Sequence, residues 1–568
     1  MTLRIVLAGV AAVLVSGVAA SAAGPADLAD AVQRRDAAAV RVLLQKKADV
    51  NAPQNDGTTA LLWAVRYDDV ETADALIRAG AKVTSANRDG ATPLQMAALN
   101  GSASMIEKLI KAGADPNGPL TSTGDTALMM AARTGKTSAL NVLIESGANV
   151  NAKESWGGTT PLMWAVSERH PDAVKVLLDH GADVHARSNF VAPANGRGFE
   201  GRTPVRDDAK QKVEEFASGW LTPLHLAARE GDVASAKLLI AAGADVNAVA
   251  GDGKDALGLA IFNGNYDLAS FLVDSNSGVN KADTQGFTPL FWAVDRRNME
   301  TAPNFPWMVT ADPLPLIRKL LDRGANPNAL VNNTPRARMR AGSPRIVFAT
   351  PLMRAAFSAD LELCKLLLEH GADPKIKSSD GETMIEAAAS LGFIQGYSKG
   401  KTPAERLEVV KLFVGLGADV NDADNYGITP LMVAANLGDT KIIQYLVDQG
   451  ADLAAYDLGK KNDGAFGASV EPLMPIDYAI GVGTFVPNNA VIIHEEAVAL
   501  MQKMMKERGI VHTTSECTLR GFTCAQANVD PKVATPAEIQ AMRRLAVGHQ
   551  VEGITGGLVV KEAAKDKK

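Results

Sequence analysis

One pattern of apolar and polar positions recurs along most of the chain. Each copy begins with a turn and T-P-L-x-x-A-A, and continues with V-x-x-L-L-x-x-G-A-D-V-N-A, as in residues 157–185, GGTTPLMWAVSERHPDAVKVLLDHGADVH. A threonine hydroxyl caps a helix, proline is tolerated at the first helical position, and the V-x-x-L-L run has helical spacing. The pattern therefore predicts two short helices in each copy, the first with a narrow buried face.

A glycine after the second apolar run sets the register of the copies. The position is occupied by Gly80, Gly113, Gly147, Gly181, Gly243, Asn276, Gly324, Gly371, Gly417 and Gly450. Glycine ends a helix in the left-handed conformation that a side chain disfavours, and asparagine tolerates that conformation next best. The shortest interval between these positions is 33 residues, and insertions lengthen some intervals to between 46 and 62. Since one copy cannot bury both of its helices alone, we expect the copies to stack into a solenoid.

The repeat closely resembles the ankyrin repeat, and the resemblance covers nearly all of residues 24–512. It implies an all-α solenoid of about twelve helix–turn–helix units with inter-repeat loops. In that family the histidine of T-P-L-H ties adjacent repeats together by hydrogen bonds. The tetrapeptide is intact only at Thr222–His225, whereas most other copies carry Leu, Gln, Met or Phe in the histidine position. Those copies are expected to depend more on packing.

Insertions divide the repeats into blocks and are the segments in which repeat proteins become specific. Residues 299–313 separate the two helices of the eighth unit, and Met501, Met504 and Met505 are expected to close the core of a worn terminal repeat. The expected organisation is a signal peptide at 1–23, repeats at 24–187, an insertion or decayed repeat at 188–218, repeats at 219–329, an arginine-rich loop at 330–348, repeats at 349–456, an insertion and capping repeat at 457–512, and a tail at 513–568.

The first residues of the chain predict export. Arg4 precedes an apolar run from Ile5 to about Ala20, and Ala20-Ser21-Ala22 matches the A-x-A pattern of a signal-peptidase site. Cleavage is the favoured outcome, and retention as an uncleaved anchor is the alternative. No later segment has the roughly 18 uninterrupted apolar residues of a membrane span. We therefore expect the mature chain in a bacterial periplasm, or outside the cell.

Only three cysteines occur in the 568 residues. Cys364 lies within an apolar helical run and is interpreted as a core residue. Cys517 and Cys524 lie close together in the tail, where an oxidising compartment favours a local disulfide. Their spacing matches no zinc or haem signature.

A basic loop contrasts with the net charge of −6. It carries Arg336, Arg338, Arg340 and Arg345. An exported acidic chain is not expected to bind nucleic acid. Two interpretations remain open: the arginines bridge acidic residues of the solenoid, or they present donors to carboxylates or phosphates of a partner. In the second interpretation Phe305 and Trp307, one insertion earlier, supply the apolar centre of the interface.

Three of the six tryptophans occupy the position after the histidine slot, namely Trp63, Trp164 and Trp292. Arg354 occupies the same position one unit after Trp292. A fully buried position would not accept both residues. The resemblance to the ankyrin repeat implies that this position lies on the inner helix, near the concave surface of the solenoid. The tryptophans are then either half-buried packing residues or an aromatic stripe that anchors a partner.

The sequence contains no glycine-rich phosphate loop, nucleophile elbow or HExxH motif. His180 and His370 precede helix-ending glycines, where a histidine has a structural role. We expect no catalytic residue, metal or cofactor. The predicted function is an exported protein-binding scaffold, and the alternative is recognition of a glycan or another small or polymeric ligand by the aromatic groove.

Overall fold

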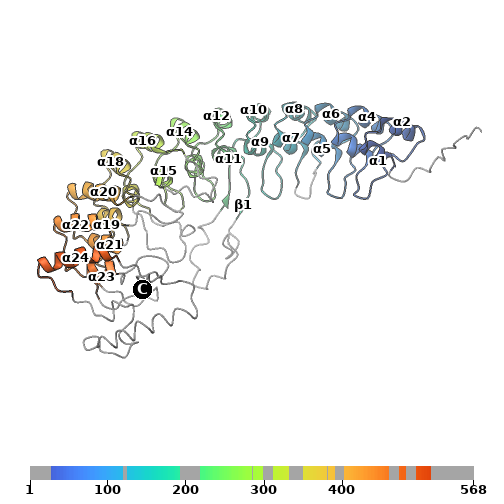
Figure 1. The fold of residues 1–568 in the computed structure, drawn as a ribbon. Helices are drawn as coiled ribbons and strands as arrows, with labels where there is room; N and C mark the ends of the chain where they lie inside the picture. Colours follow the sequence, from blue (N-terminus) through green and yellow to red (C-terminus); the bar gives the residue numbers. More distant parts are fainter. Residues whose placement is uncertain are drawn as a thin grey trace, which may run out of the picture. The chain divides into compact units, whose positions relative to one another are not determined.

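The computed structural model describes residues 27–118, 124–191, 218–284, 286–298, 311–331, 350–379, 381–390, 402–458, 472–480 and 494–512. In these residues the chain forms 24 α-helices and one pair of two-residue strands. The chain divides into two compact units, residues 1–186 and 187–568, which are described separately. The expected all-α stack of helix pairs is confirmed: in both units consecutive helices form pairs, and the pairs follow one another along the chain (Figure 1).

The first unit contains five helix pairs. They are α1 Asp27–Gln33 with α2 Ala37–Gln45, α3 Ala60–Arg66 with α4 Val70–Arg78, α5 Pro93–Asn100 with α6 Ala103–Lys111, α7 Ala127–Thr134 with α8 Thr137–Glu145, and α9 Pro161–Ser167 with α10 Pro171–Asp179. The first helix of each pair packs against the first helix of the next, from α1 through α9. The second helices from α4 to α10 form a second layer in the same way.

The second unit begins with the antiparallel strands β1 Phe190–Val191 and β2 Ser218–Gly219. Its helix pairs are α11 Pro223–Glu230 with α12 Val233–Ala241, α13 Ala256–Phe262 with α14 Tyr266–Asp274, α15 Pro289–Asn298 with α16 Leu314–Asp322, α17 Pro351–Phe357 with α18 Leu361–Glu369, α19 Met384–Ala389 with α20 Pro403–Gly415, α21 Pro430–Asn436 with α22 Thr440–Asp448, and α23 Pro475–Ile480 with α24 Glu495–Glu507. The first helices again pack in sequence from α11 to α23.

The helix ends form as the sequence chemistry predicts. The Thr160 hydroxyl accepts a hydrogen bond from the Met163 amide at 3.3 Å, and Pro161 occupies the first turn of α9. The helix-ending position is left-handed both at Gly113, with φ of 100°, and at the exceptional Asn276, with φ of 63°. Both the capping prediction and the prediction for Asn276 are confirmed.

His225 ties two adjacent helix pairs, as expected. Its Nδ1 accepts from the Thr222 amide at 3.2 Å, so its Nε2 donates to the carbonyl of Lys254, 3.2 Å away in the next loop. Burial, opposed by the hydrogen bond to Lys254, lowers the pKa of His225 to about 4. In two other helix pairs an acidic residue occupies the histidine position of the repeat. Glu386 accepts from the Thr383 amide, and Asp477 accepts from the Met474 amide. Neither contact was predicted from the sequence.

Among the described residues no helix is both long enough and apolar enough to cross a membrane. The signal-peptide residues 1–23, the arginine-rich loop and the Cys517–Cys524 pair lie outside the described residues. Met501, Met504 and Met505 are buried on α24.

Candidate interaction surface

The three tryptophans after the histidine slot have different surroundings. Trp63 on α3 and Trp164 on α9 are both half-buried in the first unit. Helices α5 and α7 lie between α3 and α9 in the packing sequence, so these two rings do not form one contiguous aromatic patch. Trp292 on α15 belongs to the second unit and is only 3 % exposed.

The expectation that this position is never fully buried is wrong for Trp292 and Arg354. Trp292 packs against Phe262 and Phe287, and its Nε1 donates to the Asp283 carboxylate at 3.1 Å. Arg354 is 0 % exposed. Its Nε donates at 2.8 Å to Asp295, which α15 contributes. Because the preceding helix supplies the counter-charge, one buried position accepts both a tryptophan and an arginine. The Trp292 ring is therefore not available to a partner in this structure.

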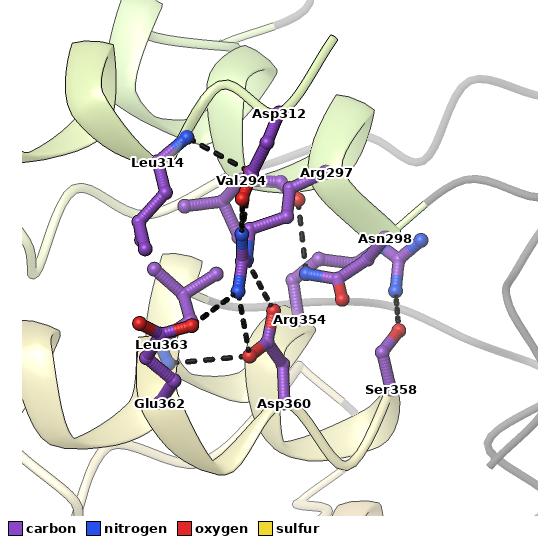
Figure 2. Close-up of polar contacts among 10 residues, drawn as sticks. All are labelled: Val294, Arg297, Asn298, Asp312, Leu314, Arg354, Ser358, Asp360, Glu362 and Leu363. Carbon is purple, nitrogen blue, oxygen red and sulfur yellow. Dashed lines mark hydrogen bonds and ion pairs between the residues drawn. The ribbon is translucent and has the colours of Figure 1, made fainter. Parts of the chain in front are cut away.

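A second arginine, Arg297, fastens three segments of the second unit (Figure 2). Its Nε donates to Asp360 at 2.7 Å, its Nη2 to Glu362 at 2.8 Å, and its Nη1 to Asp312. Asp312 also accepts from the amide of Leu314 at the start of α16. Although burial lowers it, the hydrogen bonds to Asp312 and Asp360 raise the pKa of Arg297 above its ordinary value. Since three carboxylates engage Arg297, we interpret it as a structural clamp.

Trp63 on α3 and Tyr67, directly after it, form an aromatic pair with two arginines over it. The rings of Trp63 and Tyr67 stack with centroids 5.6 Å apart and an interplanar angle of 24°. The Cζ of Arg35 lies 4.2 Å from the Tyr67 centroid, and the Cζ of Arg66 lies 5.2 Å from the Trp63 centroid. We call these four residues the N-terminal stack. Sequence reasoning identified Trp63 alone.

Trp164 has a related arrangement with one difference. The Cζ of Arg133 lies 5.2 Å from its ring centroid, the same distance as between Arg66 and Trp63. The Nε of Arg133, however, donates at 3.2 Å to Glu168. This arginine therefore has a carboxylate partner within the first unit.

Two exposed tryptophans on loops between helix pairs were missed. Trp156 is 84 % exposed on a turn in which the buried Glu154 carboxylate accepts from the amides of Trp156, Gly157 and Thr159. Trp220 is 50 % exposed with φ of 52°. It stands two residues before the capping threonine, where other loops have left-handed glycines such as Gly57 and Gly253. The replacement of this glycine was visible in the sequence.

The remaining predicted site residues lie outside the described residues: Arg336, Arg338, Arg340, Arg345, Phe305 and Trp307. In the described part of the chain no group of three or more His, Cys, Asp or Glu side chains is placed to hold a metal ion. His180 and His370 each hydrogen-bond through Nδ1 to a carbonyl four residues earlier, at 2.8 and 2.9 Å. These bonds agree with the expected structural role of both histidines.

Family models decide the classification of the chain. The model "Ankyrin repeats (3 copies)" matches residues 28–119, 113–188, 220–303 and 400–463, which is more than half of the chain, and the single "Ankyrin repeat" model matches residues 349–379. The chain belongs to the ankyrin repeat family. Ankyrin repeats imply a protein-binding scaffold and are generally non-catalytic.

Several curated ankyrin-repeat proteins are similar to the chain. The ankyrin repeat protein YahD of Escherichia coli is 28 % identical over 195 residues, which cover 30 % of this chain and 89 % of YahD. An ankyrin repeat and KH domain-containing protein of Caenorhabditis briggsae is 27 % identical over 272 residues, covering 44 % of this chain and 9 % of that protein. The chain thus spans only a small part of the latter. The crystal structure of the human ASB11 ankyrin repeat domain is 26 % identical, with a TM-score of 0.36, and covers 44 % of this chain and 98 % of that domain.

Proposed function

We propose that this ankyrin-repeat protein is exported and acts as a non-catalytic scaffold that holds a concave groove and insertion loops against a partner protein. The observation that carries the proposal is the pair of half-buried tryptophans on first helices of the first unit, each with a guanidinium group over its ring. Tryptophan, tyrosine and arginine are the residues in which binding energy at protein interfaces concentrates. Export is part of the proposal because of the apolar leader at 1–23.

The insertions of the second unit are a separate part of the proposal. Phe305 and Trp307 offer apolar anchors, and Arg336, Arg338, Arg340 and Arg345 offer donors to carboxylates or phosphates. A disulfide between Cys517 and Cys524 would close the tail in an oxidising compartment. At the base of the 299–313 insertion, Arg297 joins the end of α15 to Asp312, which precedes α16.

Site-specific photo-crosslinking tests the proposal. A benzoylphenylalanine replaces Leu99, which is exposed on the first helix α5, and in a second protein it replaces Leu416, which is exposed after the second helix α20. Both proteins are irradiated in cell-envelope extract. The proposal predicts an adduct with one discrete protein from position 99 and none with that protein from position 416. No adduct at position 99, or the same adducts at both positions, would contradict it.

A glycan ligand is the alternative, because tryptophan faces also bind sugar rings. Soluble sugars would compete with such a ligand, and its binding would persist at high ionic strength. An interface led by arginines weakens with added salt. The arginines over Trp63 and Trp164 favour the protein partner, since each covers ring surface that a sugar would need.

A further inference from the structure

We infer that the N-terminal stack, formed by Arg35, Trp63, Arg66 and Tyr67, binds an acidic segment of the partner protein through paired carboxylates. The inference rests on the proposed scaffold function and deepens it, because it names the chemistry that one part of the surface recognises. The four residues of the stack belong to the first unit, and the structure describes each of them.

The two rings are fixed before any partner arrives. The Trp63 Nε1 donates to the Gln54 side-chain oxygen at 2.7 Å, and the Gln54 amide nitrogen donates to Asp30 at 2.6 Å. The Tyr67 hydroxyl donates to the Gln33 carbonyl at 3.2 Å. The indole and phenol edges are therefore anchored to α1 and to the loop before α3. A platform held in this way loses little conformational entropy on binding.

The two arginines are placed to bind carboxylates. Both side chains are exposed, and each guanidinium lies over a ring. Stacking uses the face of a guanidinium group and leaves its N–H edge for two parallel hydrogen bonds to a carboxylate. Neither arginine has an ion pair or hydrogen bond of its side chain to another described residue. The positive charge at this site is thus not neutralised by a direct partner within the described chain.

Two nearby carboxylates, those of Asp36 and Asp69, are engaged as helix caps. The Asp36 carboxylate caps α2 by accepting from the Ala39 amide at 2.9 Å, and the Asp69 carboxylate caps α4 by accepting from the Thr72 amide at 2.9 Å. Each stabilises the positive end of a helix. Charge complementarity therefore points to a partner with negative side chains.

The arrangement favours a peptide with separate carboxylates over a single phosphate group. The two guanidinium groups lie over different rings, whose centroids are 5.6 Å apart, so each can take its own acceptor. The ring faces are covered by the stacking and by the two guanidinium groups, but both aromatic residues remain half-exposed, which leaves apolar area beside the stack for a side chain of the same segment. A segment in which two acidic residues flank an apolar one can therefore contact both guanidinium groups and the aromatic pair.

Arg133 provides a matched control within the same unit. It lies over Trp164 at the same 5.2 Å as Arg66 over Trp63, but its guanidinium is already paired with Glu168. Its removal should therefore leave recognition of an acidic segment nearly unchanged. If only the overall positive charge mattered, removing Arg133 would weaken binding as much as removing an arginine of the N-terminal stack.

Fluorescence anisotropy with the full chain tests the inference. The probe is a labelled twelve-residue peptide of repeated Asp-Leu-Asp, compared with its Asn-Leu-Asn counterpart and with a phosphoserine-Leu-phosphoserine version. The proteins are the unaltered chain, the double variant Arg35→Gln/Arg66→Gln and the control Arg133→Gln. Circular dichroism verifies that the exposed substitutions leave the fold intact.

The acidic peptide is expected to bind at least tenfold more tightly than the asparagine peptide and to weaken as salt rises. The double variant should lose at least tenfold of this affinity, and Arg133→Gln less than twofold. Equal binding of the acidic and asparagine peptides, an unchanged affinity of the double variant, or binding of the phosphopeptide alone would overturn the inference. If the protein captured at position 99 binds the double variant as well as the unaltered chain, the scaffold proposal survives and this inference fails.

Discussion

Replacing Arg354 with methionine tests how the second unit accepts a charge in its core. The side chains of Arg354 and Asp295 are 0 % and 3 % exposed, and their atoms approach to 2.8 Å. Arg354 also donates to Ser358, which is itself buried. Methionine has a similar length and no charge, so the substitution removes the pairing without opening a large cavity.

The expected cost follows from the burial of the pair. Removing one member of a buried ion pair leaves the other charge in a medium of low polarity and costs about 3–5 kcal/mol. Replacing both members, in Arg354→Met/Asp295→Leu, removes that penalty and should be close to neutral or stabilising. The coupling between the two positions is then about 3 kcal/mol or more, which corresponds to roughly a hundredfold change in an opening equilibrium.

Hydrogen exchange by mass spectrometry is the appropriate assay, because repeat proteins open locally and a single unfolding free energy is not defined for them. Peptides covering α15 and α17 should exchange about a hundredfold faster in Arg354→Met and near the original rate in the double variant. Arg78→Met is the control, since Arg78 and Asp74 lie equally close at 2.8 Å but are exposed. Its cost should stay below about 1 kcal/mol. A single variant that exchanges like the unaltered chain, or a double variant that is no better than the single one, would refute the reasoning.

Three further predictions concern single residues of the second unit. Trp220→Gly should slow local exchange of residues 218–222, because glycine relieves a left-handed conformation that costs about 1 kcal/mol or more; faster exchange would contradict this. The pKa of His225 is lowered to about 4, so the unfolded chain binds the proton first and stability should fall as pH drops from about 6.5 to 4. Hydrogen exchange of peptides covering α11 should show this dependence and lose it in His225→Gln. Burial raises the pKa of Glu386 to about 9, so the folded chain holds a proton that the unfolded chain releases above about 4.5. Stability should fall as pH rises from about 4.5 to about 9. Glu386→Gln should therefore be more stable than the unaltered chain at pH 8 but not at pH 4. Equal gains at both pH values would argue against a protonated Glu386.

The sequence predicted those features that depend on neighbours within one repeat. The threonine cap at Thr160, the left-handed Asn276 and the tie made by His225 all follow from local chemistry at fixed spacing, and the structure contains each of them. The 33-residue period, through its resemblance to the ankyrin repeat, predicted that the helix pairs stack. Local rules of this kind reach the backbone of the next unit, as His225 does at the Lys254 carbonyl, but not its side chains.

The features that were missed depend on side chains from different units. The burial of Arg354 depends on Asp295, which lies 59 residues earlier, so the position could not be judged from its own repeat. The N-terminal stack joins Arg35, after α1, to Tyr67, after α3, a contact that no single copy of the pattern contains. Trp220 was different, because aligning the loops shows a tryptophan in the glycine position.

The most direct test of the account is a titration of the unaltered chain with the purified protein that position 99 captures. Leu99→Arg places a charge among the first helices, whereas Leu416→Arg places the same charge after a second helix, and both leucines are exposed in the folded chain. A scaffold that binds through its first helices predicts saturable binding that Leu99→Arg weakens at least tenfold and Leu416→Arg leaves intact. Binding that is unsaturable, or that both variants weaken equally, would contradict the central claim.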